Sequence, residues 1–359
     1  MNPGQFAFRS RSFCLATIVL LVTAAAASAQ SIPTKLSDDQ FWKLSTEFSE
    51  PDGTFRSDNL LSNEIYFQFV IPDLIKRAKS DRIYLGVGPE QNFTYMVALK
   101  PKMAFIVDIR RGNLDLHLMY KALFEMSKDR ADFISMLFSK KRPDRLGSDS
   151  TPDQIFAAYR NVQPTEELYK QNLKAIEDHL TKDHKFGLSD GDLSGIEYVY
   201  RNFYEFGPAI NYNSSSGGYG GMRVSYAELM TATDELGVNR SFLANEDNFL
   251  FLKQLETKNL LVPVVGNFSG PKAIRAIAKY LKENNAKISA FYLSNVEDYL
   301  YRDGSWTSFC GNVASLPVDE TSTFIRSVRG GRYGNMAGFG LNSDLGNIAT
   351  ETKTCSGGK

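Results

Sequence analysis

Histidine, cysteine and tryptophan are scarce in this chain of 359 residues, which has three histidines, three cysteines and two tryptophans. Charge of one sign is not in excess either, because 41 basic residues face 41 acidic ones and no basic tract interrupts them. A near-neutral chain without a basic patch lacks the electrostatic footprint of a nucleic-acid-binding protein, so we exclude that class. No apolar run after the first thirty residues is long enough to span a bilayer.

The first 29 residues have the pattern of a secretory signal peptide. Arg9 and Arg11 precede an apolar run over residues 13–26, and residues 27–29 read Ala-Ser-Ala, the small-x-small pattern that signal peptidase cleaves. The run is shorter than the roughly 20 residues of a membrane-spanning helix, so an uncleaved anchor is the weaker alternative. Removing the leader leaves 39 basic against 41 acidic residues. We therefore expect a periplasmic or secreted protein, cleaved near Ala29, without a membrane partner.

Only two cysteines remain after residue 29, Cys310 and Cys355. In an oxidising compartment an even pair predicts one disulfide, which here would hold the C-terminal tail. The alternative is one buried and one exposed thiol.

Short apolar runs bounded by glycine, proline and acidic residues predict five strands alternating with helices. Continuous apolar strands are typical of a sheet covered on both faces, and the short helix expected over residues 92–99 makes the first two strands parallel. Two further helices are expected over residues 246–258 and 271–283. The expected strands cover residues 82–87, 103–108, 241–244 (SFLA), 260–266 (LLVPVVG) and 287–294.

The stretch from residue 113 to about residue 236 is rich in helical periodicity and poor in strand-like runs, which favours a long helical insertion. Residues 323–330 (TFIRSVRG) suit an antiparallel strand or hairpin at the sheet edge. The predicted fold is therefore one α/β domain over residues 30–359, with a doubly wound, mostly parallel Rossmann-like sheet, the insertion and an antiparallel C-terminal edge.

Ligands of such sheets bind beyond the carboxyl ends of the strands, so the residues that follow each strand are the candidate site. Glycines allow close approach of the backbone, and an acid ending the second strand can accept both hydroxyls of a ribose. Gly88 and Asp108 are 20 residues apart, the spacing usual for that acid. The third glycine of G-x-G-x-x-G is absent and Pro89 removes an amide, so we expect a cofactor with ribose but without phosphate. The candidate binding residues are Gly86, Gly88, Glu90, Asp108, Asn245, Glu246 and Asn267.

This pattern resembles class I S-adenosylmethionine-dependent methyltransferases. The resemblance implies S-adenosylmethionine as cofactor, with the loop after strand one at its methionine part and the acid after strand two at its ribose. The incomplete glycine loop and the long stretch between strands two and three depart from that family. By this resemblance Gly86, Gly88 and Glu90 belong to the loop, Asp108 holds the ribose, Asn245 and Glu246 lie on the adenine side, and Asn267 faces the methyl acceptor.

The phrases GVGPEQNF, FIVDIRR, VPVVGNFSGPKA and AFYLSNVE are similar to those of a group of uncharacterised exported bacterial proteins, known from Leptospira among others. That resemblance covers most of the chain after the leader and implies a methyltransferase-like fold without assigning an activity. An alternative reading of the same residues remains open: Gly86 and Gly88 only turn the chain, and Asp108 caps the following helix.

The segment NYNSSSGGYGG, residues 211–221, is a polar loop with glycines at one end. Such a loop can act as a lid, in which Asn211 and either Tyr212 or Tyr219 would contact a small-molecule ligand. The alternative is a simple connection between helices.

No metal site is expected. Asp190 begins an imitation of an EF-hand loop, but Arg201 occupies the twelfth position, where a glutamate is needed. His179 and His184 are five residues apart, which does not place two ligands on one helical face, so we interpret them as a solvated helix end. His117 lies in an apolar helical segment and no G-x-S-x-G motif occurs, so no hydrolase nucleophile and base are evident.

Two main functions remain. The first is methyl transfer from S-adenosylmethionine, which conflicts with export because that cofactor is made in the cytoplasm. The second is a non-catalytic exported binding module for a small nucleoside-like or other polar ligand. A third, weaker possibility is an interaction protein whose helical insertion is the working surface.

Overall fold

The structure is a computed structural model that describes residue 1 and residues 31–216, 224–329 and 342–357. The cleavage site expected near Ala29 and the lid candidate Tyr219 lie outside the described residues.

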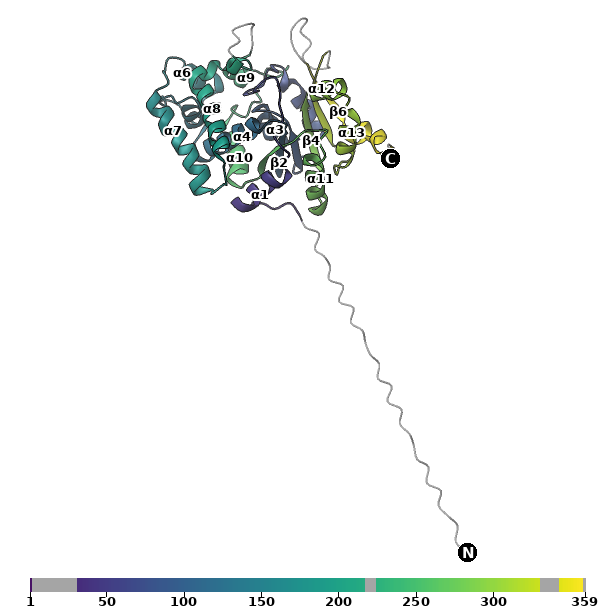
Figure 1. The fold of residues 1–359 in the computed structure, drawn as a ribbon. Coiled ribbons are helices and arrows are strands. Elements are labelled where there is room, and N and C mark those ends of the chain that lie inside the picture. Colours follow the sequence, from purple (N-terminus) through teal and green to yellow (C-terminus); the bar gives the residue numbers. More distant parts are fainter. Residues whose placement is uncertain (2–30, 217–223, 330–341, 358–359) are drawn as a thin grey trace.

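A six-stranded mixed sheet forms the centre of the molecule, with strand order β3-β2-β1-β4-β5-β6 (Figure 1). The first five strands run parallel, and β6 pairs antiparallel with β5. The chain order reverses between β1 and β4. The strands are β1 (Ile83–Gly86), β2 (Met103–Asp108), β3 (Leu261–Val265), β4 (Ile288–Ser294), β5 (Thr323–Val328) and β6 (Asn342–Asn347).

Helices account for most of the remaining described chain. They are α1 (Asp38–Phe48), α2 (Ile71–Arg77), α3 (Gln91–Leu99), α4 (Arg111–Met126), α5 (Arg130–Leu137), α6 (Pro152–Tyr159), α7 (Glu166–Asp178), α8 (Asp190–Phe206), α9 (Tyr226–Thr231), α10 (Glu246–Thr257), α11 (Ala273–Glu283), α12 (Val296–Arg302), α13 (Trp306–Ala314) and α14 (Ile348–Glu351). Single 3₁₀ turns cover Phe67–Val70, Gly207–Ala209, Ser214–Ser216 and Lys353–Gly357.

Helices cover both faces of the sheet, which explains why β1, β2 and β3 are buried at every position and, apart from Asp108 at the end of β2, carry no charge. On one face, Phe105 of β2 packs against Phe48 of α1 and Tyr280 of α11. On the other face, Tyr292 of β4 packs against Tyr95 of α3. Pro263 lies within β3, and it is tolerated there because β3 is an edge strand.

The long helical stretch expected after residue 113 is confirmed for the described residues. Helices α4 to α10 all lie between β2 and β3 in the chain, and the described part of this stretch contributes no strand to the sheet. Figure 1 shows α6, α7 and α8 gathered at the side of the molecule opposite to β6 and α13. Helix α4 joins the two parts, because it contacts both β3 and α8.

The strand expected over residues 241–244 is wrong. This segment forms turns instead, in which Ser241 N–H donates to Asn239 Oδ1 (2.9 Å), Phe242 N–H to Thr94 Oγ1 (3.2 Å) and Ala244 N–H to the Ser241 carbonyl (2.9 Å). Phe242 is fully buried against Phe93. The residues of this segment are mostly apolar because they pack between helices and not because they belong to a sheet. The apolar run misled the prediction because burial alone does not distinguish a strand from a packed turn.

The expected antiparallel C-terminal edge is confirmed, but its outermost strand is not residues 323–330. Residues 323–328 form β5, which is parallel to β4, and the antiparallel edge strand is the polar segment NSDLGN of β6. Only Ser343 and Leu345 of β6 are buried, because one face of this strand packs inward and the other meets solvent. A polar edge strand resists pairing with other chains, which is why its sequence gives little strand signal.

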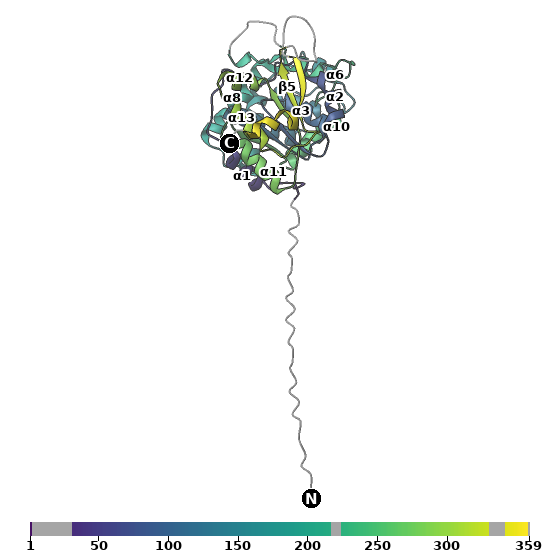
Figure 2. The same ribbon diagram turned by 90° about the vertical axis from the view of Figure 1, so that its right-hand side faces the viewer.

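Cys310 of α13 and Cys355 form a disulfide, as expected, with their Cα atoms 5.1 Å apart. In Figure 2, β5, α11 and α13 are on the side of the molecule that carries the C-terminal residues. The disulfide therefore joins the last described turn to the helical layer beside β5.

The interpretation of His179 and His184 as a solvated helix end is wrong as well. The chain after α7 continues as a π-helical turn, His179–Asp183, in which His184 N–H donates to the His179 carbonyl (3.1 Å). A π-turn brings residues five apart onto one face, whereas an α-helix would place them about 140° apart. The side chains of His179 and His184 are only 20% and 12% exposed.

Candidate functional site

The candidate site lies at the carboxyl ends of β1 and β4, where the strand order reverses. Ligands of open parallel sheets bind at this position because the loops from the two strands diverge to opposite faces. The loop after β1 is residues 87–90, and β4 ends at Ser294, whose φ of 50° turns the chain sharply away.

The two glycines of the loop have separate structural causes. Gly88 has a φ of +76°, a conformation that side chains rarely adopt. Gly86 lacks a Cβ because the side chain of Asn92 occupies that space. Asn92 Nδ2 donates to the carbonyls of residues 87–89 at 2.9, 3.2 and 2.7 Å, and Asn92 Oδ1 accepts from the Tyr84 hydroxyl (2.8 Å). The carbonyls of the loop thus point toward the side-chain amide of Asn92 in α3.

Asp108 ends β2 as expected, yet its carboxylate is paired within the chain. Oδ1 accepts from the backbone N–H and the Nε of Arg110, both at 3.0 Å, and Oδ2 accepts from Arg110 Nη2 (2.9 Å). Arg110 also donates to the carbonyls of Ser57 and Asp58. Asp108 and Arg110 are each less than 10% exposed. A ribose would reach this carboxylate only by displacing a buried arginine.

Glu90 belongs to a group of buried polar side chains that the sequence did not predict. Its Oε1 accepts from the Ser62 N–H (3.2 Å), whereas its Oε2 is buried without a hydrogen-bond partner. Burial raises the pKa of Glu90 to about 8, so the carboxyl is mostly protonated at neutral pH. A carboxyl kept in this state with one oxygen unused is costly to bury unless something completes its hydrogen bonding.

Tyr120 and Tyr226 lie near the Glu90 carboxyl, and the ring of His117 is 6.4 Å from that of Tyr120. We call these four residues the Glu90 cluster. His117 Nε2 donates to the Gly88 carbonyl (2.9 Å), and burial lowers the pKa of His117 to about 4, so its Nδ1 is a buried acceptor without a partner. Tyr120 and Tyr226 are fully buried, and their hydroxyls interact with each other but neither makes a well-formed hydrogen bond. Burial first, and the nearby Glu90 carboxyl further, raise the pKa of both tyrosines.

The sequence offered little warning of this cluster. Its members come from the β1 loop, from α4 and from α9, and only His117 and Tyr120 are near each other in the chain, three residues apart on one face of α4. Glu90 was expected at the site, but as part of a cofactor loop.

A second buried network lies beside this cluster and is fully paired. Glu64 Oε1 accepts from the hydroxyls of Tyr292 (2.9 Å) and Ser294 (2.6 Å), and Glu64 Oε2 accepts from Gln91 Nε2 (2.8 Å). It joins β4 to the start of α3. Because its polar atoms are satisfied, we interpret it as a structural support for the neighbouring cluster.

The other predicted site residues lie in three separate places. Asn267 lies on the same rim as Asp108, because β3 is next to β2 and Gly266 N–H donates to the Asp108 carbonyl (2.7 Å). Its Oδ1 accepts from the N–H and the hydroxyl of Ser269, both at 2.9 Å.

Asn245 and Glu246 do not follow a strand, because the strand expected before them does not form. Asn245 caps α10 by accepting from the Asn248 N–H (2.9 Å). Glu246 pairs with the buried Arg130 at 3.0 Å. An adenine-side role for these two residues therefore loses its structural basis.

Asn211 and Tyr212 lie in the connection between α8 and α9. Asn211 pairs with Ser225 in an isolated bridge, and its Oδ1 accepts from the Asn213 N–H (3.0 Å). The adjoining Tyr226 N–H donates to the Ile210 carbonyl (2.9 Å). This connection is therefore anchored beside the Glu90 cluster through Tyr226.

Within the described residues, no helix is both long and apolar enough to cross a membrane. A comparison with curated proteins found no match. A family model described as a domain of unknown function (DUF7790) matches residues 60–348, a range that includes every strand of the sheet and the whole Glu90 cluster. The chain belongs to this DUF7790 family.

Proposed function

We propose that the protein binds a small polar molecule at the Glu90 cluster and acts as a binding module. One observation carries the proposal: Glu90 Oε2, His117 Nδ1 and the hydroxyls of Tyr120 and Tyr226 are buried without a well-formed hydrogen bond, on side chains packed near the switch point of the sheet. Native proteins rarely leave such atoms unsatisfied, so a bound ligand or an ordered water is the expected partner.

The chemistry of the four side chains defines the ligand class. His117 Nδ1 only accepts, Glu90 Oε2 accepts or donates according to its protonation, and the two tyrosine hydroxyls do both. Phe93 packs edge-on against His117 and Tyr120, which gives the region an aromatic wall. A small molecule that donates hydrogen bonds through hydroxyl or amine groups fits this set. A ligand with a charged amine would additionally stabilise the ionised form of Glu90, and its ammonium group would be attracted to the faces of the aromatic rings.

A second candidate is methyl transfer from S-adenosylmethionine on a methyltransferase-like fold. It is supported by the adjacent ends of β1 and β2, which carry Gly86, Gly88 and Asp108 as that class of enzyme requires. Against it, Asn92 fills the glycine loop and Arg110 pairs with both oxygens of Asp108. The expected leader would also carry the protein away from the compartment in which that cofactor is made.

Native mass spectrometry of gently purified protein tests the proposal. We expect wild type to carry a noncovalent small molecule that is absent from Tyr226→Phe, which removes one hydroxyl of the cluster. The matched control is Tyr204→Phe, whose ring stacks on Tyr169 in the α7 and α8 region. Absence of any adduct, together with unchanged melting in the presence of a panel of small amines and polyols, would refute the proposal. Calorimetry with S-adenosylmethionine and S-adenosylhomocysteine decides the second candidate.

A further inference from the structure

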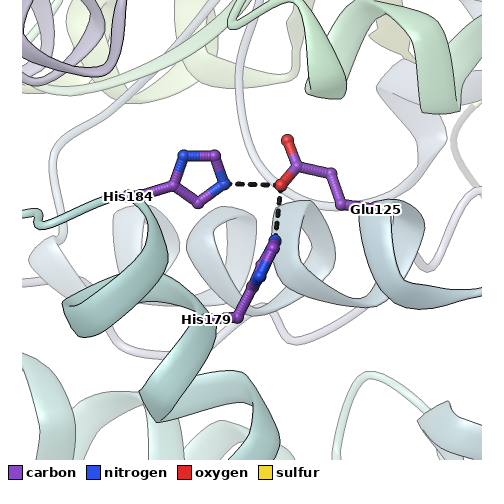
Figure 3. A group of neighbouring side chains, drawn as sticks. All are labelled: Glu125, His179 and His184. Carbon is purple, nitrogen blue, oxygen red and sulfur yellow. Dashed lines mark hydrogen bonds and ion pairs between the residues drawn. The ribbon is translucent and has the colours of Figure 1, made fainter.

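Three side chains from two helical segments converge on one point outside the Glu90 cluster (Figure 3). Glu125 is near the end of α4, whereas His179 begins the π-helical turn after α7 and His184 follows that turn. Glu125 Oε2 lies 2.7 Å from His179 Nε2 and 2.6 Å from His184 Nε2. One ligand atom from each residue lies within 4.8 Å of the others. We propose that Glu125, His179 and His184 bind a first-row divalent metal ion, zinc in the first place.

The outer atoms of all three residues are held by partners, so their inner atoms are aimed at the common point. His179 Nδ1 is 2.9 Å from Asp183 Oδ2, and His184 Nδ1 is 2.7 Å from Asp38 Oδ1. Histidines that bind metals usually donate their second ring N–H to a carboxylate, which selects the tautomer with a free Nε2. Both rings have this arrangement, so two of the three histidines in the chain are paired with a carboxylate through Nδ1.

The remaining contacts stiffen the site further. Glu125 Oε1 accepts from Lys121 Nζ (2.7 Å), which leaves Oε2 as the inward oxygen. Asp38 accepts from Asn259 Nδ2 (2.8 Å), and His184 stacks on Phe186 with ring centroids 4.9 Å apart. Side chains fixed in this way present their donor atoms with little loss of rotamer entropy on binding.

The charges favour a cation. With neutral rings, the carboxylates of Asp38, Glu125 and Asp183 face the ammonium of Lys121, which pairs with Glu125. A second ammonium, that of Lys253, donates to the Glu125 carbonyl (3.0 Å). These five side chains keep a formal excess of one negative charge, which favours a bound cation.

The ligand types select among cations. Two imidazole nitrogens and one carboxylate oxygen suit zinc, and also ferrous iron, whereas calcium and magnesium prefer oxygen ligands alone. Three protein ligands leave a coordination position open, and both rings are partly exposed. Ligand atoms around tetrahedral zinc lie about 3.3 Å apart. Glu125 Oε2 is closer than that to both histidine nitrogens, and the three ligand atoms span up to 4.8 Å, so zinc binding requires the carboxylate to move outward and the two rings to approach each other.

The test is zinc titration of tag-free protein stripped with a chelator, followed by calorimetry. Cys310 and Cys355 are disulfide-bonded, so their thiolates do not compete. We expect one zinc ion per chain and binding that is weaker by at least about a hundredfold in His184→Gln. Asp38→Asn is expected to weaken binding about tenfold, whereas Asp39→Asn, its neighbour in the first turn of α1, leaves it unchanged.

Cobalt(II) provides a second measurement that needs no variant. Wild type should give the intense visible bands of four-coordinate cobalt with nitrogen and oxygen ligands, and zinc should abolish them. Circular dichroism checks that each variant is folded. Zinc binding no tighter in wild type than in a folded His179→Gln/His184→Gln double variant, or a cobalt spectrum identical to that of the aquo ion, would overturn the proposal.

Discussion

Replacing Glu90 by glutamine should make the protein more stable, and by an amount that depends on pH. Burial raises the pKa of Glu90 from 4.5 to about 8. One pKa unit corresponds to about 1.4 kcal/mol, so ionising this carboxyl in the folded chain costs at most about 5 kcal/mol. Because the folded pKa is the higher one, the contribution of Glu90 is fully present below pH 4.5 and is lost as the pH rises through 8.

The magnitude is best measured as a difference between two pH values. Between pH 5 and pH 9, wild type should lose about 4 kcal/mol relative to Glu90→Gln, whose amide does not titrate. Any fixed difference in the contacts of amide and carboxyl cancels in this comparison. Asp115 and Glu256, whose pKa values burial also raises to about 8, titrate in both proteins and cancel as well.

Urea unfolding followed by circular dichroism at pH 5, 7 and 9 gives the required free energies. The control is Glu47→Gln, a carboxylate on α1 whose side chain is 63% exposed and whose removal should leave the profile of wild type. If the difference between Glu90→Gln and wild type stays constant within about 1 kcal/mol from pH 5 to pH 9, the buried carboxyl does not have the environment described here. The same variant should lose the small molecule bound by wild type, so stability and binding should change in opposite directions.

Three further substitutions test other parts of the structure by their free energy of unfolding in urea. Gly86→Ala should cost about 2 kcal/mol, because a Cβ there overlaps the Asn92 amide and breaks its hydrogen bonds, and an unchanged value would contradict that packing. Asp108→Ala should cost about 3 kcal/mol by leaving Arg110 buried without its carboxylate, whereas a loss below about 1 kcal/mol would mean that the pair behaves as a solvated one. Cys355→Ser opens a loop between cysteines 45 residues apart and should cost about 4 kcal/mol, and chemically reduced wild type should then match the variant.

The predictions for the fold succeeded where the signal is local. The apolar runs of β1 and β2 and the helical pattern of α10 are all encoded within about ten consecutive residues. The long helical stretch after β2 has the same kind of signal. The failures at residues 241–244 and at β6 have one cause, because a residue's burial is decided by the element packed against it and not by its neighbours in the chain.

The candidate sites show the same division. Gly86, Gly88 and Asp108 were placed correctly at strand ends. Their hydrogen-bond partners were not predicted, because Asn92 and Arg110 reach them through contacts that no spacing rule describes. The Glu90 cluster and the group of Glu125, His179 and His184 each combine segments far apart in the chain.

The sequence by itself determined most helices and the apolar central strands, and it favoured parallel, buried strands and a disulfide between the two cysteines, but it did not determine residues 241–244 or β6. Those outcomes follow from short-range periodicity, capping and composition. Tertiary structure alone decided which polar groups remain unpaired beside Glu90 and that a π-turn brings two histidines to one glutamate. The physical reason is that partners and local pKa values depend on three-dimensional packing, where the nearest atoms to a side chain come from distant parts of the chain.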